Sequence, residues 1–465
     1  MAIKSVNPFN NKILKTFDEI TDQELERKVE IAHKSYLNWK NTAIDERSKL
    51  LLKVSSIMRD RKAELAKLIT LEMGKLIKQS ESEIEMCASV YEYYANNAAE
   101  FLKDRPLKTD DGEAFLRLTP MGVILAVEPW NYPFNQVARL TAPNLMAGNT
   151  VMLKHSSNVP QCAEMIERIF REAGAAEGVF TNLFLSGKRV GKLAADNRIV
   201  GLSLTGSEGA GSSLAEAAGK NLKKSVLELG GSDPFIVLED GDIDSAVEKA
   251  VVGRFGNMGQ ACTSAKRIIV ADAIADEFLQ KFTAKLTDLK VGDPLDPETE
   301  VGPLSTEDAA AKIEKQVSET VAAGARVVLG GKRIDREGAF FEFTILTDIK
   351  PGMVAYHEEI FGPVASFYRV KDDAEAISLA NDTTFGLGGV VFSRDIKRAI
   401  NVADQIDTGM VFINQSLASR PDLPFGGTKR SGYGRELSPL GIEEFVNKKL
   451  IFISCDQTKK PQPQE

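Results

Sequence analysis

Apolar residues recur every three or four positions through the first hundred residues, which predicts helices there. Thr21 and Glu24 have the spacing of a capping box and predict a helix start. The apolar face that follows consists of Leu25, Val29, Ala32, Tyr36 and Trp39. Two more helices are expected near 45–61 and 62–73, and Gly74 is the expected C-cap of the second.

From residue 121 the pattern changes to short apolar runs that alternate with helical segments. Strands are expected at 122–127, 150–154, 180–185 and 199–204, and again at 267–270, 325–330, 363–370, 389–393 and 410–414. The alternation pauses at 226–238. Strands that alternate with helices predict crossover units and a mostly parallel, doubly wound sheet. The simplest α/β arrangement is two Rossmann-like lobes joined near Gly230 and Gly231.

Two further segments have strand character outside these lobes. Residues 103–119 predict a hairpin around the turn Asp110-Asp111-Gly112, and 441–455 returns to short apolar runs. Both are apolar enough to need strand partners, because exposed edges aggregate unless they are covered. The polar end, 459–465, is expected to be a flexible tail.

Length and charge narrow the class of protein. A chain of 465 residues is too long for one compact core, and its length suggests about three domains. The net charge of −8 gives no basic footprint for nucleic acid. No apolar run reaches the roughly 18 residues needed to cross a bilayer, and the first residues lack the apolar stretch of a signal peptide. We therefore expect a cytoplasmic enzyme with neither nucleic acid nor membrane as a partner.

Cysteines and histidines are few. The cysteines are Cys87, Cys162, Cys262 and Cys455, and the absence of a CxxC pair argues against a disulfide framework and against a metal site. With only three histidines, a papain-like Cys-His arrangement is disfavoured. Cys87 and Cys162 lie in helical patterns and fit a structural role. Cys262 differs, because it follows a glycine-containing turn just before a strand.

A glycine-rich turn follows the run 199–204. The fingerprint GxGxxG is missing after the first α/β strand, and T-G-S-E-G-A-G at 205–211 leads into a helix instead. Such a turn presents free backbone N–H groups and the positive end of a helix dipole to a phosphate. A connection that binds no ligand fits this pattern equally well.

Seven motifs occur together and in a familiar order. They are P-W-N-Y-P with Asn131, M-L-K with Lys154, T-G-S at 205–207, L-E-L-G-G with Glu228, G-Q-A-C with Cys262, E-E-I-F-G-P with Glu359, and P-F-G-G-T-K-R-S-G-Y-G-R-E at 424–436. Over nearly its whole length the chain resembles the aldehyde dehydrogenase superfamily.

The resemblance implies a catalytic role for three residues. Cys262 would attack the aldehyde carbon and form a thiohemiacetal, while the Asn131 amide and the Cys262 backbone N–H would donate to the oxyanion. Hydride transfer would leave a thioester. Glu228 would then activate the hydrolytic water, since it lies between Leu227 and Leu229, where desolvation raises the pKa of a carboxyl.

The resemblance also implies a nicotinamide cofactor. The residues expected to bind it are Trp130, Lys154, Ser157, Gly206, Ser207, Leu229, Glu359 and Phe361. Lys154 would bind the adenosine ribose and Glu359 the nicotinamide ribose. Gly206 and Ser207 would meet the pyrophosphate, and Phe361 would pack near the nicotinamide.

Ser157 departs from a common family pattern. Members that prefer NAD often carry glutamate three residues after the lysine, and this chain has serine there. An acid would hold the 2′-hydroxyl and repel a 2′-phosphate. We therefore expect NAD or NADP as the cofactor, with NADP accepted.

The substrate is indicated by Arg139, eight residues after Asn131. Succinate-semialdehyde dehydrogenases place arginine there, and a guanidinium fork suits a carboxylate. We therefore expect oxidation of succinic semialdehyde to succinate, although a helix arginine paired with a surface acid fits the pattern too. Gly256 occupies a place where some of these enzymes supply a second arginine, and Arg420 is the candidate substitute.

The resemblance divides the chain into domains. Residues 1–102 and 120–230 would form a cofactor-binding domain, and 231–436 a catalytic domain. Residues 103–119 and 437–458 would form a small β arm for self-association, as a dimer or a tetramer.

Other readings remain open from the sequence. The substrate could be another aldehyde, such as glutaric semialdehyde or a medium-chain aldehyde. Three further alternatives concern the type of protein. It could belong to a branch that passes the acyl group to coenzyme A, it could be a thiol hydrolase without a cofactor, or it could be a catalytically silent protein of the same fold. The presence of both Cys262 and Glu228 favours an enzyme that hydrolyses its thioester.

Overall fold

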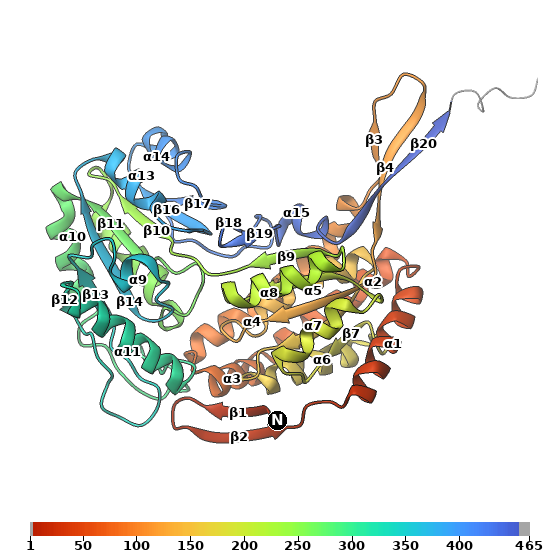
Figure 1. Ribbon diagram of the computed structural model, residues 1–465, viewed down its shortest axis with the longest axis horizontal. Helices are drawn as coiled ribbons and strands as arrows, with labels where there is room; N and C mark the ends of the chain where they lie inside the picture. Colours follow the sequence, from red (N-terminus) through yellow and green to blue (C-terminus); the bar gives the residue numbers. More distant parts are fainter. Residues whose placement is uncertain (1–2, 455–465) are drawn as a thin grey trace, which may run out of the picture.

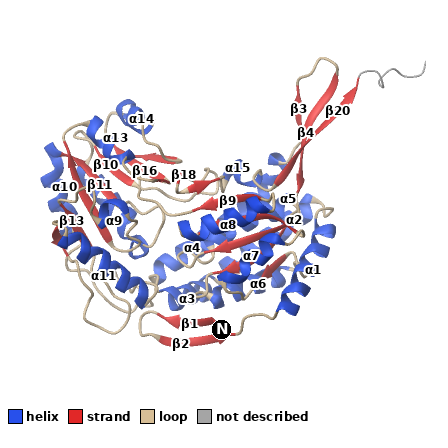
Figure 2. Ribbon diagram, in the orientation of Figure 1, coloured by secondary structure: helices blue, strands red, loops and turns tan. Residues whose placement is uncertain are grey.

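The computed structural model describes residues 3–454, which form two α/β lobes and a protruding arm (Figure 1). Each lobe has its own sheet with helices packed around it (Figure 2). The expected α/β fold with two lobes is therefore confirmed. Cys455, the part of the expected arm after 454, and the expected tail at 459–465 lie outside the described residues.

The first lobe contains a six-stranded sheet in the order β19-β9-β8-β5-β6-β7. Its strands are β5 (Val123–Glu128), β6 (Thr150–His155), β7 (Phe180–Asn182), β8 (Ile199–Thr205), β9 (Lys224–Glu228) and β19 (Gly432–Tyr433). All neighbours are parallel except β19 and β9. Parallel strands send their carboxyl ends to one edge, so the loops after β5, β8 and β9 meet there.

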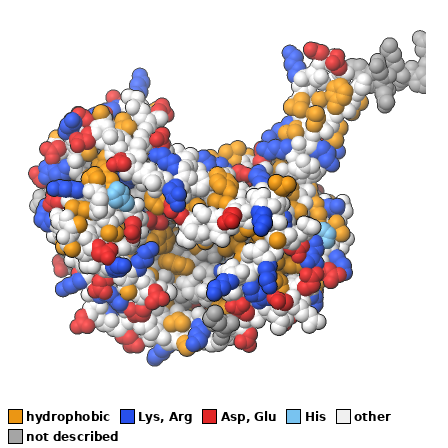
Figure 3. All heavy atoms as spheres, viewed as in Figure 1, with side chains coloured by type: hydrophobic (Ala, Val, Ile, Leu, Met, Phe, Trp, Pro, Cys, Tyr) orange, Lys and Arg blue, Asp and Glu red, His pale blue; other side chains and the backbone are white. Residues whose placement is uncertain are grey.

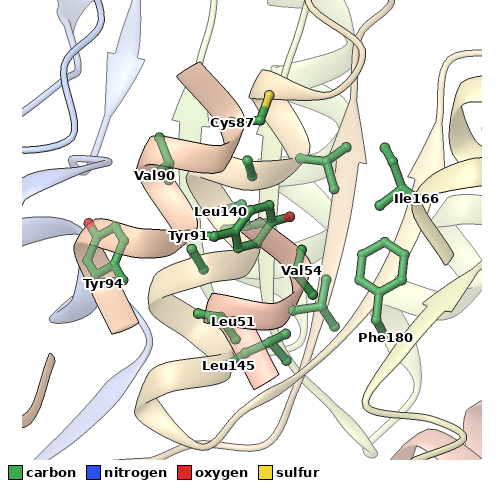
Figure 4. Packing of buried hydrophobic residues seen from close by; sticks show 14 of the residues in the cluster. Leu51, Val54, Cys87, Val90, Tyr91, Tyr94, Leu140, Leu145, Ile166 and Phe180 are labelled. Carbon is green, nitrogen blue, oxygen red and sulfur yellow. The ribbon is translucent and has the colours of Figure 1, made fainter. Parts of the chain in front are cut away.

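Helices of the first lobe supply most of its core. They are α1 (Asp22–Trp39), α2 (Ile44–Asp60), α3 (Lys62–Met73), α4 (Ile77–Phe101), α5 (Asn135–Ala147), α6 (Pro160–Ala173), α7 (Gly187–Ala195) and α8 (Glu208–Lys220). The capping box of α1 and the left-handed Gly74 at the end of α3 are as expected. Figure 4 shows Tyr91 of α4 packed among Leu51 of α2 and Leu140 of α5, all of them buried.

The second lobe contains a seven-stranded sheet in the order β12-β13-β14-β11-β10-β16-β17. Its strands are β10 (Pro234–Val237), β11 (Arg267–Ala271), β12 (Arg326–Leu329), β13 (Thr344–Thr347), β14 (Val364–Val370), β16 (Gly388–Phe392) and β17 (Met410–Ile413). Its helices are α9 (Ile243–Phe255), the 3-10 turn η1 (Gly256–Gly259), α10 (Asp272–Ala284), α11 (Glu307–Ala322), α12 (Val354–His357), α13 (Asp373–Asn381) and α14 (Ile396–Ala403). A short pair, β15 (Phe385–Gly386) and β18 (Thr428–Lys429), lies outside this sheet.

Several strands of the fold were not predicted, among them β13, β15, β18 and β19 and an N-terminal pair. Strands β1 (Ile3–Asn7) and β2 (Lys12–Phe17) form an antiparallel pair before the first helix. All of β2 except Phe17 is exposed, so its residues show no alternation between a buried and a solvent face. A strand without that alternation leaves no period-two pattern in the sequence.

The arm consists of β3 (Arg105–Leu107), β4 (Gly112–Pro120) and β20 (Val446–Ser454). β4 pairs with β3 as the expected hairpin, and β20 pairs with β4 along its whole length. Leu450 is 60% and Phe452 is 50% exposed, and Figure 3 shows apolar side chains along the arm. The strand expected from 441 begins only at Val446, because Ser438–Ile442 form the short helix α15.

Candidate functional site

A cavity of about 550 Å³ lies at the carboxyl edge of the first sheet and is walled by both lobes. The lining residues that the sequence analysis singled out are Trp130, Asn131, Gly206, Ser207, Leu229, Cys262, Glu359 and Phe361. A second cavity of about 350 Å³ is lined by Cys262, Arg139 and Tyr132. Cys262 lines both cavities, so two different ligands can approach its thiol from two sides.

The loop that carries Cys262 follows an unusual turn. Asn257 and Met258 have φ of 52° and 56°, a region that residues other than glycine seldom adopt. The Asn257 side chain holds this turn by donating to the backbone oxygens of Asn131 and Gln260, at 3.0 and 3.3 Å. The strained turn thus brings the cysteine loop against the loop that follows β5.

The Cys262 side chain is partly buried, and its surroundings oppose ionisation. Burial raises the pKa of the Cys262 thiol to about 12, and the ammonium of Lys266 and the guanidinium of Arg139 act in the lowering direction. Lys266 is itself buried and donates to the Cys262 backbone oxygen at 2.6 Å. The thiolate needed for attack therefore depends on nearby positive charge.

Asn131 is placed to stabilise negative charge beside Cys262. Its side chain is 4% exposed, and its Nδ2 donates to the backbone oxygen of Gln260 at 3.0 Å. An amide nitrogen carries two N–H donors, so one remains for a ligand oxygen. The expected oxyanion role fits this geometry.

Glu228 ends β9 and is 1% exposed. Neither of its carboxyl oxygens has a hydrogen-bond partner among the described residues. Burial raises the pKa of this carboxyl well above its ordinary value, and Glu436 acts in the same direction. In this arrangement the carboxyl packs against Gly426, where an added Cβ would meet Oε1 at 2.7 Å. Its raised pKa gives Glu228 the proton affinity of a general base. The carboxyl fits in this position because Gly426 has no Cβ.

Six of the residues expected at the cofactor line the larger cavity, whereas Lys154 and Ser157 are not part of its wall. Trp130 and Phe361 meet edge to face, with ring centroids 5.7 Å apart. Ser207 caps α8, which begins at the cavity wall with its N–H groups facing outward. Lys154 and Ser157 follow at the carboxyl end of β6, where Lys154 is partly buried and Ser157 exposed. Trp130 and Phe361 can pack against a nicotinamide ring, and the N–H groups at the start of α8 can bind phosphate. This combination fits a dinucleotide.

Glu359 lies next to the connection between the two lobes. Its Oε1 pairs with Lys266 Nζ at 2.9 Å and accepts from the Gly231 backbone N–H at 3.1 Å. The carboxylate faces the larger cavity from there. The Glu359 carboxylate can accept hydrogen bonds from ribose hydroxyls once its contacts with Lys266 and Gly231 rearrange.

Arg139 lies in the wall of the smaller cavity but is not free. Its Nε donates to Glu436 Oε2 at 2.7 Å, Nη2 donates to the same oxygen, and the guanidinium lies 3.9 Å from the centroid of Phe425. Both side chains of this pair are 3% exposed. Only Nη1 is without a partner among the described residues.

The family model for the aldehyde dehydrogenase family matches residues 1–451. The chain belongs to the aldehyde dehydrogenase family. A succinate-semialdehyde dehydrogenase [NADP(+)] of Deinococcus radiodurans is 48% identical, over 96% of this chain and 94% of that protein. A probable succinate-semialdehyde dehydrogenase [NADP(+)] of Synechocystis is 47% identical, over 98% of this chain and all of that protein.

Solved structures of relatives agree with this fold. The succinic semialdehyde dehydrogenase of Streptococcus pyogenes, solved with NADP+, superposes with a TM-score of 0.96 at 46% identity, over 97% of this chain and all of that one. Among the residues described here, no helix is both long and apolar enough to cross a membrane.

Membership of the aldehyde dehydrogenase family explains why the Cys262 thiol, the Asn131 amide and the Glu228 carboxyl lie together. The structure adds three residues that were not predicted, namely Lys266, Ser419 and Glu83. Lys266 was not predicted, although it lies in the G-Q-A-C-T-S-A-K motif. Ser419 lines the smaller cavity with a buried hydroxyl that has no partner among the described residues. Its neighbour Arg420, the expected substrate residue, is exposed and pairs with Asp422 at 2.9 Å, outside both cavities.

The third added residue is Glu83, which fixes the Asn131 loop from behind. Its Oε1 accepts from the backbone N–H groups of Phe134 and Asn135 at 2.9 and 3.1 Å, and its Oε2 pairs with the buried Lys75. In the sequence, Glu83 is recognisable only as a carboxylate within an expected helix. The spacing gives no sign of its contacts with Phe134 and Asn135.

Replacing Asn131 with alanine removes the side-chain donor to the oxyanion. We expect kcat for aldehyde oxidation to fall by about 10²–10³, with a smaller change in KM, because the interaction strengthens only as charge develops. Steady-state kinetics with reduced-cofactor absorbance measures both constants. Asn97→Ala, which removes an amide that donates to the Tyr93 backbone oxygen, is the matched control. A kcat for Asn131→Ala equal to that of this control would contradict the role.

Proposed function

We propose that this chain oxidises succinic semialdehyde to succinate with NADP, and also with NAD, as the hydride acceptor. The observation that carries the proposal is Arg139, a buried arginine in the wall of the cavity that opens on Cys262. The names of the relatives at 47% and 48% identity support the same substrate and cofactor.

Each catalytic step then has a residue. Cys262 sulfur bonds to the aldehyde carbon, and the oxyanion receives hydrogen bonds from Asn131 and the Cys262 backbone N–H. Bound NADP supplies the hydride acceptor, and loss of hydride leaves a thioester on Cys262. Glu228 takes a proton from water as the water oxygen bonds to the thioester carbon. The C–S bond breaks, and succinate leaves with its new oxygen.

The carboxylate of the substrate would be bound by two groups in the smaller cavity. Arg139 offers Nη1, while its other donors hold Glu436. The Ser419 hydroxyl is a buried donor without a partner among the described residues. A charged carboxylate supplies the acceptor that both groups lack.

The adenosine end of the cofactor would lie at Lys154 and Ser157. Lys154 is partly buried, and burial lowers the pKa of its ammonium. A 2′-phosphate next to this cation would offset that cost, and the Ser157 hydroxyl can donate to it without repulsion. This pairing supports NADP as an accepted cofactor.

We also propose that the chain self-associates through the arm. Leu450 and Phe452 of β20 are exposed apolar residues on an edge strand, a surface that natural proteins cover.

The function is tested by following cofactor reduction with a panel of aldehydes against NADP and NAD. We expect succinic semialdehyde to give the highest kcat/KM, above glutaric semialdehyde and above butanal, its counterpart without the carboxylate. In Arg139→Ala, kcat/KM for succinic semialdehyde should fall by about 10–100-fold, because a charge-assisted hydrogen bond is lost.

Two controls belong to this test. Butanal in the same variant reports any general damage from leaving Glu436 unpaired, and its kcat/KM should change much less. Arg117→Ala, on the arm, removes a surface arginine paired with Asp104. An equal loss for both aldehydes in Arg139→Ala would contradict carboxylate recognition. A higher kcat/KM for butanal in the parent enzyme would favour a medium-chain substrate.

Placing a carboxylate at residue 157 should select against NADP. In Ser157→Glu we expect KM for NADP to rise at least about tenfold while KM for NAD stays the same or falls, because glutamate repels a 2′-phosphate and accepts from a 2′-hydroxyl. Ser378→Glu on α13 adds the same charge at an exposed position of the other lobe. Parallel changes for both cofactors would show that residue 157 does not face the 2′ position.

A further inference from the structure

A single buried arginine joins two segments of the second lobe that meet at the larger cavity. Arg254 is the next-to-last residue of α9 and is fully buried. Its Nε donates to the Val364 backbone oxygen at 2.8 Å, and its Nη2 donates to the backbone oxygens of Ile360, at 3.0 Å, and Gly362. Its Nη1 donates to the backbone oxygen of Gly259 at 3.4 Å. One guanidinium is therefore bonded to both segments.

The two segments carry different parts of the site. The cofactor loop, residues 358–363, connects α12 to β14 and contains Glu359 and Phe361. The nucleophile turn, residues 256–261, leads to Cys262. The cofactor loop is neither helix nor strand, so its buried carbonyl groups need hydrogen-bond donors from elsewhere in the chain. The buried arginine supplies these donors at two positions of the loop.

The backbones of the two segments are in direct contact beside Arg254. Gly259 has a φ of 68°, and a Cβ added there would lie 2.3 Å from the Gly362 backbone oxygen and 2.9 Å from Arg254 Nη1. Only glycine permits so close an approach. The cofactor loop is thus positioned directly on the nucleophile turn, without side chains between them.

Arg254 has no carboxylate bonded to it. Among the described residues its N–H groups donate only to backbone oxygens. Burial lowers the pKa of its guanidinium to about 9, while the Glu359 carboxylate acts in the opposite direction. Burying a guanidinium is costly unless its N–H groups are bonded, and an apolar side chain would fill the same space without that cost. The position therefore requires the donors of an arginine.

We propose that Arg254 is a positioning residue for hydride transfer, which holds the cofactor loop on the nucleophile turn and so sets the distance from Cys262 to the nicotinamide. This inference rests on the roles given above to Cys262, Glu359 and Phe361. Lys266 is a second tie between the same parts, because its Nζ pairs with Glu359 and donates to the Cys262 backbone oxygen. A misplacement of about 1 Å can lower the rate of a reaction by about 100-fold.

The test compares a reaction that uses the cofactor with one that does not. With NADP and succinic semialdehyde, rapid mixing gives the rate of cofactor reduction in the first turnover. Without NADP, the activated ester p-nitrophenyl acetate can acylate Cys262 directly. The sulfur bonds to the acetyl carbon, p-nitrophenolate leaves, and water activated by Glu228 then hydrolyses the thioester to acetate. Only the first reaction depends on where the nicotinamide lies.

In Arg254→Met we expect the first-turnover rate of cofactor reduction to fall by about 10–100-fold, while ester hydrolysis stays within about twofold of the parent rate. Calorimetric titration should show a higher Kd for NADP, because Glu359 and Phe361 are no longer held in place. Arg254→Lys keeps the charge but offers three donors in place of five, so its rate of cofactor reduction should lie between those of the parent and Arg254→Met.

Arg267→Met is the matched control. Arg267 is also buried and donates to backbone oxygens, but these belong to Ser232, Leu379 and Ala380, outside the cofactor loop and the nucleophile turn. The ratio of cofactor reduction to ester hydrolysis in this variant should equal the parent ratio, and its Kd for NADP should not change.

Two results would overturn the inference. They are an unchanged rate of cofactor reduction in Arg254→Met, and an equal loss of cofactor reduction and ester hydrolysis in that variant. Arg254→Lys takes its place in both comparisons where Arg254→Met does not fold. Absence of cofactor reduction by the parent enzyme would instead overturn the proposed function, and ester hydrolysis at the parent rate in Cys262→Ala would overturn the role of Cys262.

Discussion

Two reciprocal hydrogen bonds between the lobes hold the reacting groups together. Asn131, on the first lobe, donates through its side chain to the Gln260 backbone oxygen, and Asn257, on the second, donates to the Asn131 backbone oxygen. Both lengths are 3.0 Å. Since Cys262 lies only two residues beyond Gln260, these bonds fix the thiol relative to the amide that would bind its oxyanion. Glu83 and Lys75 support the same loop from inside the first lobe.

This junction also determines the electrostatics. Bringing the lobes together buries Cys262, Glu228 and Arg139 in one water-poor region, where desolvation is the largest influence on each pKa. Lys266 partly offsets that effect at the thiol while it pairs with Glu359. A buried carboxyl with a raised pKa can serve as a base in place of histidine. The hydrolysis proposed above can therefore proceed with Glu228 as its base.

Much of the fold was predictable because it depends on local patterns. The capping box at Thr21, the left-handed Gly74 and the hairpin at 105–120 are set by a few adjacent residues. The parallel strands are short apolar runs that are buried on both faces, which distinguishes them from their helices. The exposed strand β2 has no such pattern and was missed.

The site residues that lie in recognisable sequence motifs could be predicted. Cys262, Asn131 and Glu359 all lie at the cavity, Asn131 in the loop after β5 and the other two in the loops that lead into β11 and β14. Contacts between distant segments were not predictable, such as Arg139 with Glu436 and Glu83 with the Asn131 loop. Arg420 and Ser419 illustrate the same difficulty, since adjacent loop residues face opposite ways and only the fold determines which one enters the cavity.

The most direct test of the account is a single-turnover experiment on Glu228→Gln with NADP and succinic semialdehyde. We expect one reduced cofactor per active site and then no further turnover, because the thioester forms and no base remains to hydrolyse it. Mass spectrometry of the digested protein should place a succinyl group on the peptide that contains Cys262. Continued turnover at the parent rate, or an unmodified Cys262 after the burst, would contradict a covalent mechanism in which Cys262 attacks and Glu228 releases the product.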